Sequence, residues 1–284
     1  MESKKIVLSA DSTCDLGDEL KEKYSVNYFP YHILLGDKTY KDGVDITPVE
    51  VFNYYKTHKK LPKTAAVGVG EYIDYFKKWP VDEYDVIHIN LSSAMSSSYQ
   101  SCCIAAKECE NVYTVDSRNL SSSLALLIIE ASQMIEKGMS AKEIQIELLK
   151  IREKIDASFV VDTLEFLHAG GRCSAISALG ANILKLKPCI EVNTKEGKME
   201  VGKKYRGEIE KVFPQYIKDR LSRPEEIKKD KAFITHSCDD EKANVIYDMV
   251  KEMGVFDRVY KTTASCTISS HCGPNTLGIL FIRK

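Results

Sequence analysis

The sequence IVLSADSTCD at residues 6–15 decides the fold that we predict for this chain. Its first five residues form a short apolar run, which is typical of a strand buried inside a parallel sheet. The run ends in the small polar residues Asp11, Ser12 and Thr13. Because ligands of open α/β sheets collect outside the carboxyl ends of the strands, this opening also indicates a candidate binding edge.

The same unit recurs through the first half of the chain. Further strands are predicted at residues 27–35, 38–40, 84–91 and 111–115, and helices at residues 97–109, 121–137 and 141–154. Another helix is predicted to begin at Thr47, where Pro48 suits the first helical position and Glu50 completes a capping box. This alternation predicts an α/β fold with a parallel-rich N-terminal sheet flanked by helices.

The second half of the chain has a different pattern. A hairpin is predicted from strands at residues 189–193 and 198–205, joined by the turn KEG at residues 195–197. Other strands are predicted at residues 158–161, 231–235, 258–261 and 277–282, and helices at residues 208–221 and 241–253. We therefore predict a C-terminal mixed sheet with helices, and we divide the chain into two domains, residues 1–155 and residues 156–284.

The composition argues against several classes of protein. Forty basic residues face 41 acidic ones, so the formal net charge is −1 and we expect no nucleic-acid binding. The longest late apolar run, residues 124–129, is about a third of a membrane span, so we expect a cytoplasmic protein with no stable membrane insertion. The nine cysteines contain no CxxC pair, which favours buried thiols over a metal site or a disulfide framework.

A run of serines follows one of the predicted strands. Five of the seven residues at positions 92–98 are serines, which is more than a single helix start requires. Hydroxyl groups and free backbone N–H groups at such an edge suit an anion of low charge, such as a carboxylate. We predict that Ser93 faces a ligand; the alternative is that these serines only cap the following helix.

Two segments of the second half contain candidate polar ligands. The segment LEFLHAGGR, residues 164–172, ends in a glycine pair and Arg172, whose fixed charge could reach an anion across the domain interface. The alternative is that Arg172 only offsets the dipole at a helix C-terminus. His271 lies beside a Gly-Pro turn, and a lone histidine is more often structural than functional.

Taken in order along the chain, five segments resemble the DegV family of fatty-acid-binding proteins: residues 11–16, 91–101, 116–117, 164–172 and 271–278. The resemblance covers nearly the whole chain. It implies a two-domain α/β protein with one long-chain fatty acid of the C16–C18 type, such as palmitate, stearate or oleate, between the domains. The N-terminal domain would hold the head group, and the C-terminal domain would complete the pocket.

The resemblance also assigns residues and a partner. Thr64 and Ser93 are expected to bind the carboxylate, and Arg172 and His271 are expected near the head group. No residue has a catalytic role, and no cofactor other than the bound lipid is expected. Relatives present the fatty acid to a separate ATP-dependent kinase that makes acyl-phosphate for phospholipid synthesis, so a fatty acid kinase subunit is the expected partner.

The sequence departs from the family pattern in two places. The usual Ser and Pro are missing after Thr64, and the usual Leu-Ser-Gly-Thr is replaced by Met-Ser-Ser-Ser at residues 95–98. These departures affect loop shape, acyl preference and partner recognition more than lipid binding itself. Large apolar residues of the second half are candidates for the wall of a tunnel, with core packing as the alternative for each: Phe159, Leu167, Ile176, Leu179, Ile183 and Leu186.

Three other functions stay open at the level of sequence. Ser, His and Asp are all present, as a hydrolase requires, but the chain has no G-x-S-x-G elbow. Gly68 and Gly70 form a fragment of a nucleotide- or phosphosugar-binding motif, but Ile73 occupies the third glycine position. A regulatory interaction module with incidental lipid would contain the same pocket as a carrier.

Overall fold

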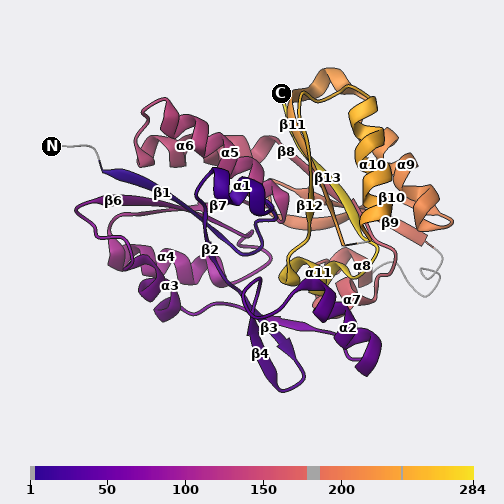
Figure 1. Ribbon diagram of the computed structural model, residues 1–284, viewed down its shortest axis with the longest axis horizontal. Coiled ribbons are helices and arrows are strands. Elements are labelled where there is room, and N and C mark those ends of the chain that lie inside the picture. Colours follow the sequence, from indigo (N-terminus) through magenta and orange to yellow (C-terminus); the bar gives the residue numbers. More distant parts are fainter. Residues whose placement is uncertain (1–3, 178–185, 238) are drawn as a thin grey trace.

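The computed structural model describes residues 4–177, 186–237 and 239–284. Within these ranges the chain forms three sheets with helices packed around them (Figure 1). This architecture confirms the predicted α/β class, with a parallel N-terminal sheet and a mixed C-terminal sheet. No helix among the described residues is long and apolar enough to cross a bilayer.

The first sheet is parallel throughout and has the strand order β2-β1-β6-β7. Its strands are β1 (Lys5–Asp11), β2 (Asn27–Phe29), β6 (Tyr84–Asn90) and β7 (Val112–Asp116). The helices that accompany it are α1 (Asp18–Lys23), α3 (Val69–Phe76), α4 (Ser98–Cys109), α5 (Ser122–Glu136) and α6 (Ala141–Ile151). Helices α3 and α4 lie on one face of the sheet, and α5 and α6 lie on the other (Figure 1).

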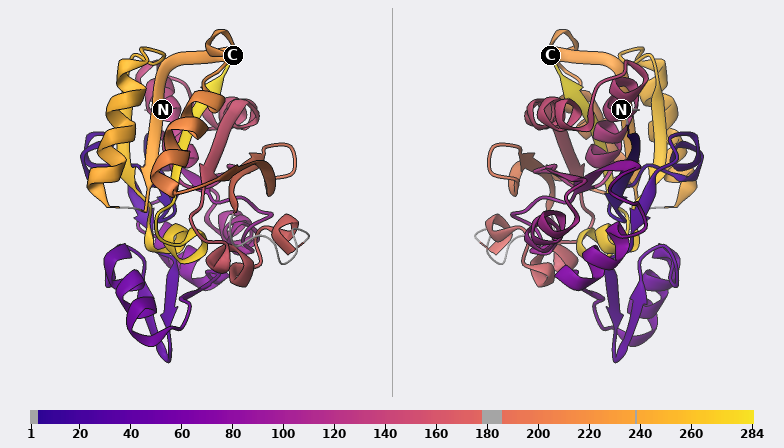
Figure 2. Two further views of the ribbon diagram at one scale, coloured as in Figure 1. Left: turned by 90° about the vertical axis from the view of Figure 1, so that its right-hand side faces the viewer. Right: turned by 90° about the vertical axis from the view of Figure 1, so that its left-hand side faces the viewer.

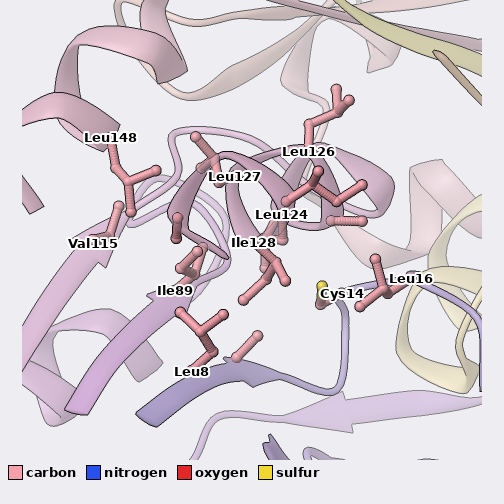
Figure 3. Close-up of a cluster of buried hydrophobic side chains, with 14 of the residues drawn as sticks. Leu8, Cys14, Leu16, Ile89, Val115, Leu124, Leu126, Leu127, Ile128 and Leu148 are labelled. Atoms are coloured by element: carbon pink, nitrogen blue, oxygen red, sulfur yellow. The ribbon is translucent and has the colours of Figure 1, made fainter. Parts of the chain in front are cut away.

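The core of this first unit lies between the sheet and α5. Every residue from Ser122 to Ala131 in α5 is buried, which explains why its apolar run is continuous rather than amphipathic. Leu124 and Ile128 of α5 lie in one cluster with Leu8 and Ile89 of the strands (Figure 3). Helix α5 also packs against the third sheet, so it lies between the two large sheets.

The second sheet is small, with the antiparallel order β4-β3-β5. It consists of β3 (His32–Leu35), β4 (Lys38–Lys41) and β5 (Lys63–Ala65), and it carries α2 (Pro48–His58) in a unit that projects from the rest of the molecule (Figure 2). The capping box predicted at Thr47 and Glu50 is present. The single strand predicted at residues 27–35 is wrong: it divides at Pro30, which has no N–H to donate, into β2 and β3 of different sheets.

The third sheet has the order β10-β9-β8-β13-β11-β12, and only its β11–β12 pair is parallel. The strands are β8 (Ile155–Val160), β9 (Leu186–Asn193), β10 (Lys198–Arg206), β11 (Ile227–His236), β12 (Val259–Thr263) and β13 (Leu277–Arg283). The helices are α7 (Glu165–Gly170), α8 (Ser174–Ser177), α9 (Ile209–Arg220), α10 (Asp240–Glu252) and α11 (Cys266–Cys272), with short 3-10 turns at Arg152–Lys154 and Pro224–Glu226. The predicted hairpin is the β9–β10 pair.

The division of the chain at residues 155/156 stays a prediction. Strand β8 begins at Ile155, next to the predicted boundary. However, α5 from the first half packs against β13, and α11 from the second half packs against α2, β3 and β5. The two halves of the chain are therefore joined by packing between several of their elements and not by a linker alone.

Candidate functional site

A cavity lies where the three sheets meet. The space free of protein atoms amounts to about 910 Å³ when the open space at the mouth of the cavity is included. Its walls come from the loops after β6 and β7, from β5, from one face of the third sheet, and from α7 and α11. Most of the wall is apolar, with Leu91, Met95, Leu120, Phe159, Leu167, Met199, Ile268, Cys272 and Leu280 among its larger side chains.

We group four polar side chains of the wall, Thr64, Ser96, Arg172 and His271, as the polar cluster. Thr64 Oγ1 and His271 Nε2 are 2.8 Å apart, although the two residues are 207 positions apart in the sequence. The Arg172 guanidinium donates from Nε to the Met95 carbonyl at 3.3 Å, next to Ser96, and from Nη1 to the Gly170 carbonyl at 2.6 Å. Thr64, Ser96, Arg172 and His271 thus all line the cavity.

Three separate elements bring these groups together. Thr64 is the middle residue of β5, where it pairs with Ile33 of β3. His271 lies in the last turn of α11. Arg172 follows Gly171, whose left-handed backbone (φ 66°) ends α7 and turns the chain toward the cavity. The glycine pair thus ends the helix, as predicted.

The polar cluster carries a single full positive charge at neutral pH. Burial and, to a smaller extent, the nearby charge of Arg172 together lower the pKa of His271 to about 4. The imidazole is therefore neutral at pH 7, and Arg172 is the cation. A neutral imidazole, two hydroxyls and one guanidinium are suited to a ligand end with one negative charge.

Ser93 is not brought to this cluster. Its hydroxyl donates to Asp116 Oδ2 at 2.7 Å, its backbone N–H donates to Asp116 Oδ1 at 3.1 Å, and it is not among the wall residues. Ser96, from the same serine run, lines the cavity instead. The sequence pointed to the run, but which hydroxyl faces the cavity depends on the turn between β6 and α4.

The proposed tunnel wall is present in part. Phe159 and Leu167 line the cavity. Ile176 is buried in the surrounding core, and Leu186 is half-buried at the start of β9; neither contributes to the wall. Leu179 and Ile183 lie outside the described residues. No specific sequence signal indicates the wall residues of the first half, such as Tyr31 and Leu120.

A serine–histidine–aspartate arrangement does exist in the first sheet. Ser9 Oγ lies 2.8 Å from His88 Nδ1, and His88 Nε2 lies 3.1 Å from Asp11 Oδ1. All three residues are fully buried, and none of them lines the cavity. The Asp11 carboxylate also accepts hydrogen bonds from Tyr31, Tyr72 and the Leu91 backbone, so this network braces the core rather than facing a substrate.

Gly68 and Gly70, the fragment of a nucleotide-binding motif, have a structural role at the start of helix α3. Gly68 is the N-cap of α3, and its backbone N–H donates to Glu71 Oε1 at 3.2 Å. A carboxylate therefore takes the position that a phosphate would need at this helix start. This contact disfavours the nucleotide-binding alternative.

Two further questions concern the described residues: whether side chains gather as metal ligands, and whether a cysteine thiol is ionised. No group of three or more His, Cys, Asp or Glu side chains in this part of the chain could hold a metal ion. The eight cysteines that the structure describes are free, and most of them are buried. Burial raises the pKa of Cys272, which lines the cavity, to about 12, so its thiol is protonated at neutral pH.

Comparison with known proteins identifies relatives over the full length. The family model described as "Uncharacterised protein, DegV family" matches residues 5–284. A DegV domain-containing protein of Clostridium perfringens is 31% identical over 284 residues, which cover 99% of each chain.

Two solved structures extend this comparison. A DegV family protein from Thermus thermophilus, described by its fatty acid binding, has a TM-score of 0.89 and 27% identity, covering 99% of this chain and 100% of its own. A stearic acid-binding protein from Eubacterium ventriosum has a TM-score of 0.86 and 26% identity, covering 99% and 98%.

Proposed function

This chain belongs to the DegV family, and on that premise we propose that it is a carrier that holds one long-chain fatty acid in the cavity and performs no chemistry on it. The observation that carries the proposal is an apolar cavity that has the polar cluster of Thr64, Ser96, Arg172 and His271 in its wall. The binding of fatty acids by the Thermus and Eubacterium relatives supports the same ligand class.

The polar cluster suits a carboxylate. An ionised carboxylate accepts hydrogen bonds and donates none, and the hydroxyls of Thr64 and Ser96 and the guanidinium of Arg172 can all donate. Each charge-assisted bond contributes about 1.5–3 kcal/mol net. Ser96 now donates to Ser98 Oγ at 2.9 Å, a bond that a ligand oxygen can replace.

The apolar wall suits the tail and supplies most of the affinity. At ~0.8 kcal/mol per buried methylene, about fifteen carbon groups of a C16 acid give roughly 12 kcal/mol of transfer free energy. Lost ligand freedom removes a substantial part of this gain. The head group therefore fixes the orientation of the lipid, and we expect ligands of the palmitate, stearate or oleate type.

A kinase partner belongs to the same proposal. We expect the carrier to present the carboxylate to an ATP-dependent fatty acid kinase in the cytoplasm, which would yield acyl-phosphate for phospholipid synthesis. Arg172, a member of the cluster, is exposed, so the head-group end has a route to a partner while the tail stays enclosed. The contact between Thr64 and His271 supports this use, because the two residues come from different halves of the chain.

Binding is tested first on the protein as purified and after delipidation. Native mass spectrometry should show one added mass matching a long-chain fatty acid, and titration of the delipidated protein with palmitate should restore it. Thr64→Ala and Ser96→Ala should each weaken palmitate binding about tenfold or more. A wild-type protein that takes up no fatty acid would sink the proposal.

Ser93→Ala is the matched control for Ser96→Ala. Because Ser93 bonds Asp116, its loss should change palmitate affinity little. If Ser93→Ala weakens binding and Ser96→Ala does not, the prediction from the sequence resemblance is right and the assignment to Ser96 is wrong.

The kinase role and the absence of catalysis need separate assays. Lipid-loaded protein mixed with a fatty acid kinase and ATP should give acyl-phosphate, and its absence would remove the presentation role while leaving lipid binding intact. Purified protein should not hydrolyse short or long acyl esters. Ester hydrolysis that is lost in a cavity-wall variant would favour the hydrolase alternative.

A further inference from the structure

One glycine lies directly against the histidine of the polar cluster. A Cβ atom placed on Gly170 would overlap His271 Nδ1 and would come within 3.2 Å of Cε1 and 3.4 Å of Cγ of the same ring. The imidazole therefore rests on the bare Cα of Gly170. Gly170 is the last residue of α7 and does not need a left-handed backbone there, since only Gly171 has a positive φ. Space, and not backbone conformation, is the reason for glycine at this position.

We propose that Gly170 is a positioning residue for His271. It fixes the position of the imidazole ring and the ring nitrogen that carries the proton. In this way it makes the Thr64 hydroxyl a hydrogen-bond donor toward the ligand. This inference rests on the proposed function and assigns Gly170, which does not touch the ligand, a part in selecting the ionised acid. Its basis is the contact between the glycine and the ring, together with the state of the two ring nitrogens.

The first step concerns Nδ1 of His271. Within the described residues this buried atom has no hydrogen-bond partner, and Gly170 covers it. A buried N–H without an acceptor is rarer and more costly than a buried acceptor without a donor. The neutral ring therefore carries its proton on Nε2 and leaves the lone pair on Nδ1.

The second step concerns Thr64. With the proton on Nε2, the 2.8 Å contact is a hydrogen bond from His271 to Thr64 Oγ1. The threonine oxygen then accepts from the ring, so its own proton is free to point into the cavity. Thr64 becomes a donor of fixed direction, which suits a carboxylate oxygen.

The third step concerns selectivity. The cluster then offers donors to the ligand: the hydroxyl of Thr64 and the guanidinium of Arg172, whose Nε and Nη1 are already held by the carbonyls of Met95 and Gly170. A carboxylate, which only accepts, uses these donors fully, whereas a fatty alcohol of the same length accepts fewer bonds. The ratio of acid affinity to alcohol affinity is therefore the property that Gly170 controls.

Gly170→Ala tests this inference, because a purely local effect and a displacement of the His271 ring change the melting temperature in opposite directions. Alanine is the better helix former, so a purely local effect would raise the melting temperature. If the methyl group displaces the ring, the Thr64 contact breaks instead. Palmitate affinity should then fall about tenfold, hexadecanol affinity should change much less, and the melting temperature should not rise.

Gly70→Ala is the matched control. Gly70 is an exposed glycine in helix α3, and a Cβ atom there would meet nothing within 4 Å among the described residues. This variant should keep the wild-type affinities for palmitate and hexadecanol. It shows what the same substitution does where no ring lies against the glycine.

A double-mutant cycle with His271→Ala keeps the inference testable if Gly170→Ala alone folds poorly. Once the ring is absent, Gly170→Ala should cause no further loss of palmitate affinity and should raise the melting temperature. An equal loss of palmitate affinity in both backgrounds, or no loss in either, would overturn the inference.

The tautomer gives a readout that does not need lipid. Nitrogen-15 spectra of histidine-labelled, delipidated protein, assigned with His271→Ala, should show the Nε2–H form in the wild type and a changed signal in Gly170→Ala. An Nδ1–H form in the wild type would overturn the inference. Because this measurement uses lipid-free protein, a failure of fatty acid binding would sink the proposed function without deciding the role of Gly170.

Discussion

At the scale of single residues, the pKa values of two titratable groups close to the cavity, one buried and one half-buried, shift in opposite directions. Burial lowers the pKa of His271 to about 4, whereas burial raises the pKa of Asp15 to about 7. The Asp15 carboxyl accepts hydrogen bonds from Ser121, a wall residue of the cavity, at 2.5 Å and from the Ser265 backbone at 2.9 Å. These bonds reduce the cost of burying Asp15 but do not remove it.

The shift of Asp15 predicts a pH dependence of stability. Its pKa is higher in the folded than in the unfolded protein, so the folded state binds more protons between about pH 4 and 7. The stability that Asp15 contributes is complete below about pH 4 and is lost as the pH rises through 7, by up to about 4 kcal/mol. Denaturant unfolding of the wild type and Asp15→Asn should show that the variant gains relative stability as the pH rises.

His271→Gln provides a control of opposite sign for that experiment. The His271 pKa is depressed on folding, so its contribution is present above about pH 6.5 and is lost as the pH falls toward 4. The wild type should therefore gain stability relative to His271→Gln as the pH rises across this window. Parallel pH profiles for the wild type and both variants would contradict both assignments.

At the scale of elements, the tip of the β9–β10 hairpin is bonded to the loop after β6 and to the 3-10 turn at Arg152–Lys154. Ser92 donates from Oγ to the Gly197 carbonyl at 2.7 Å, and Thr194 donates to the Glu153 carbonyl at 3.1 Å. A Cβ atom on Gly197 would overlap Ser92 Oγ and lie 3.3 Å from Arg118 Cα. Met199, two residues beyond, lines the cavity, so this contact holds one wall in place.

Gly197→Ala should therefore be costly. The substitution adds the strain of a positive φ (71°) to a clash with Ser92, and we expect a loss of about 1–3 kcal/mol in the free energy of unfolding. Gly254→Ala is the control, because Gly254 has a similar φ (62°) and nothing within 4 Å among the described residues. Hydrogen exchange at residues 193–199 should increase only in Gly197→Ala. Equal losses in both variants would show that the contact with Ser92 contributes nothing.

Asp42 connects the projecting unit to α11. Its buried carboxylate accepts hydrogen bonds from Ser12, from the backbone of Cys266 and Thr267, and from the Thr267 hydroxyl at 2.6 Å. Because α11 carries His271 and the small sheet carries Thr64, this one side chain helps to fix the distance between two residues of the polar cluster.

Asp42→Ala leaves several buried donors without an acceptor and should lower the free energy of unfolding by about 3 kcal/mol. It should also weaken palmitate binding, because the Thr64–His271 contact loosens. Asp45→Ala is the control, since Asp45 is exposed and its carboxylate accepts a hydrogen bond from the Lys41 backbone. A palmitate affinity unchanged in Asp42→Ala would show that the two halves of the polar cluster keep their distance without this side chain.

At the scale of the whole molecule, local signals predict most of the fold. The apolar runs and the capping box at Thr47 are complete within a few residues of sequence, and the strands and helices predicted from them are present except for the strand at residues 27–35, which divides in two. Helices α1, α3, α8 and α11 and strand β5 were not predicted. Strand β5 and helix α11 are short and are held by distant partners, Thr64 by Ile33 and Cys266 by Asp42.

The same reasoning explains what could be predicted of the site. Thr64, Arg172 and His271 came from a resemblance that spans the chain, and the structure brings them to one cavity. Ser93 and Ser96 are three residues apart in one turn, and no local rule decides which of them faces inward. Asp116, at the end of a neighbouring strand, holds Ser93. Only the assembled fold contains that information.

Ligand binding should stabilise the molecule as a whole, because the cavity wall takes side chains from loops that follow strands of the first sheet and from strands of the other two sheets. A fatty acid at 100 times its dissociation constant adds about 2.7 kcal/mol, which corresponds to a rise of roughly 5–10 °C in the melting temperature. The rise should be smaller for Thr64→Ala at the same palmitate concentration. A methyl ester of palmitate that stabilises the wild type as well as the acid does would show that the polar cluster contributes no affinity.

The most direct test of the central claim is a crystal structure of the delipidated protein soaked with palmitate that carries bromine on its terminal carbon. We predict one lipid in the cavity, with its carboxylate within hydrogen-bond distance of Thr64 and with the anomalous signal of bromine enclosed by the apolar wall. A bromine signal beside Thr64, or a cavity whose side chains have closed on one another and hold no lipid, would contradict the account.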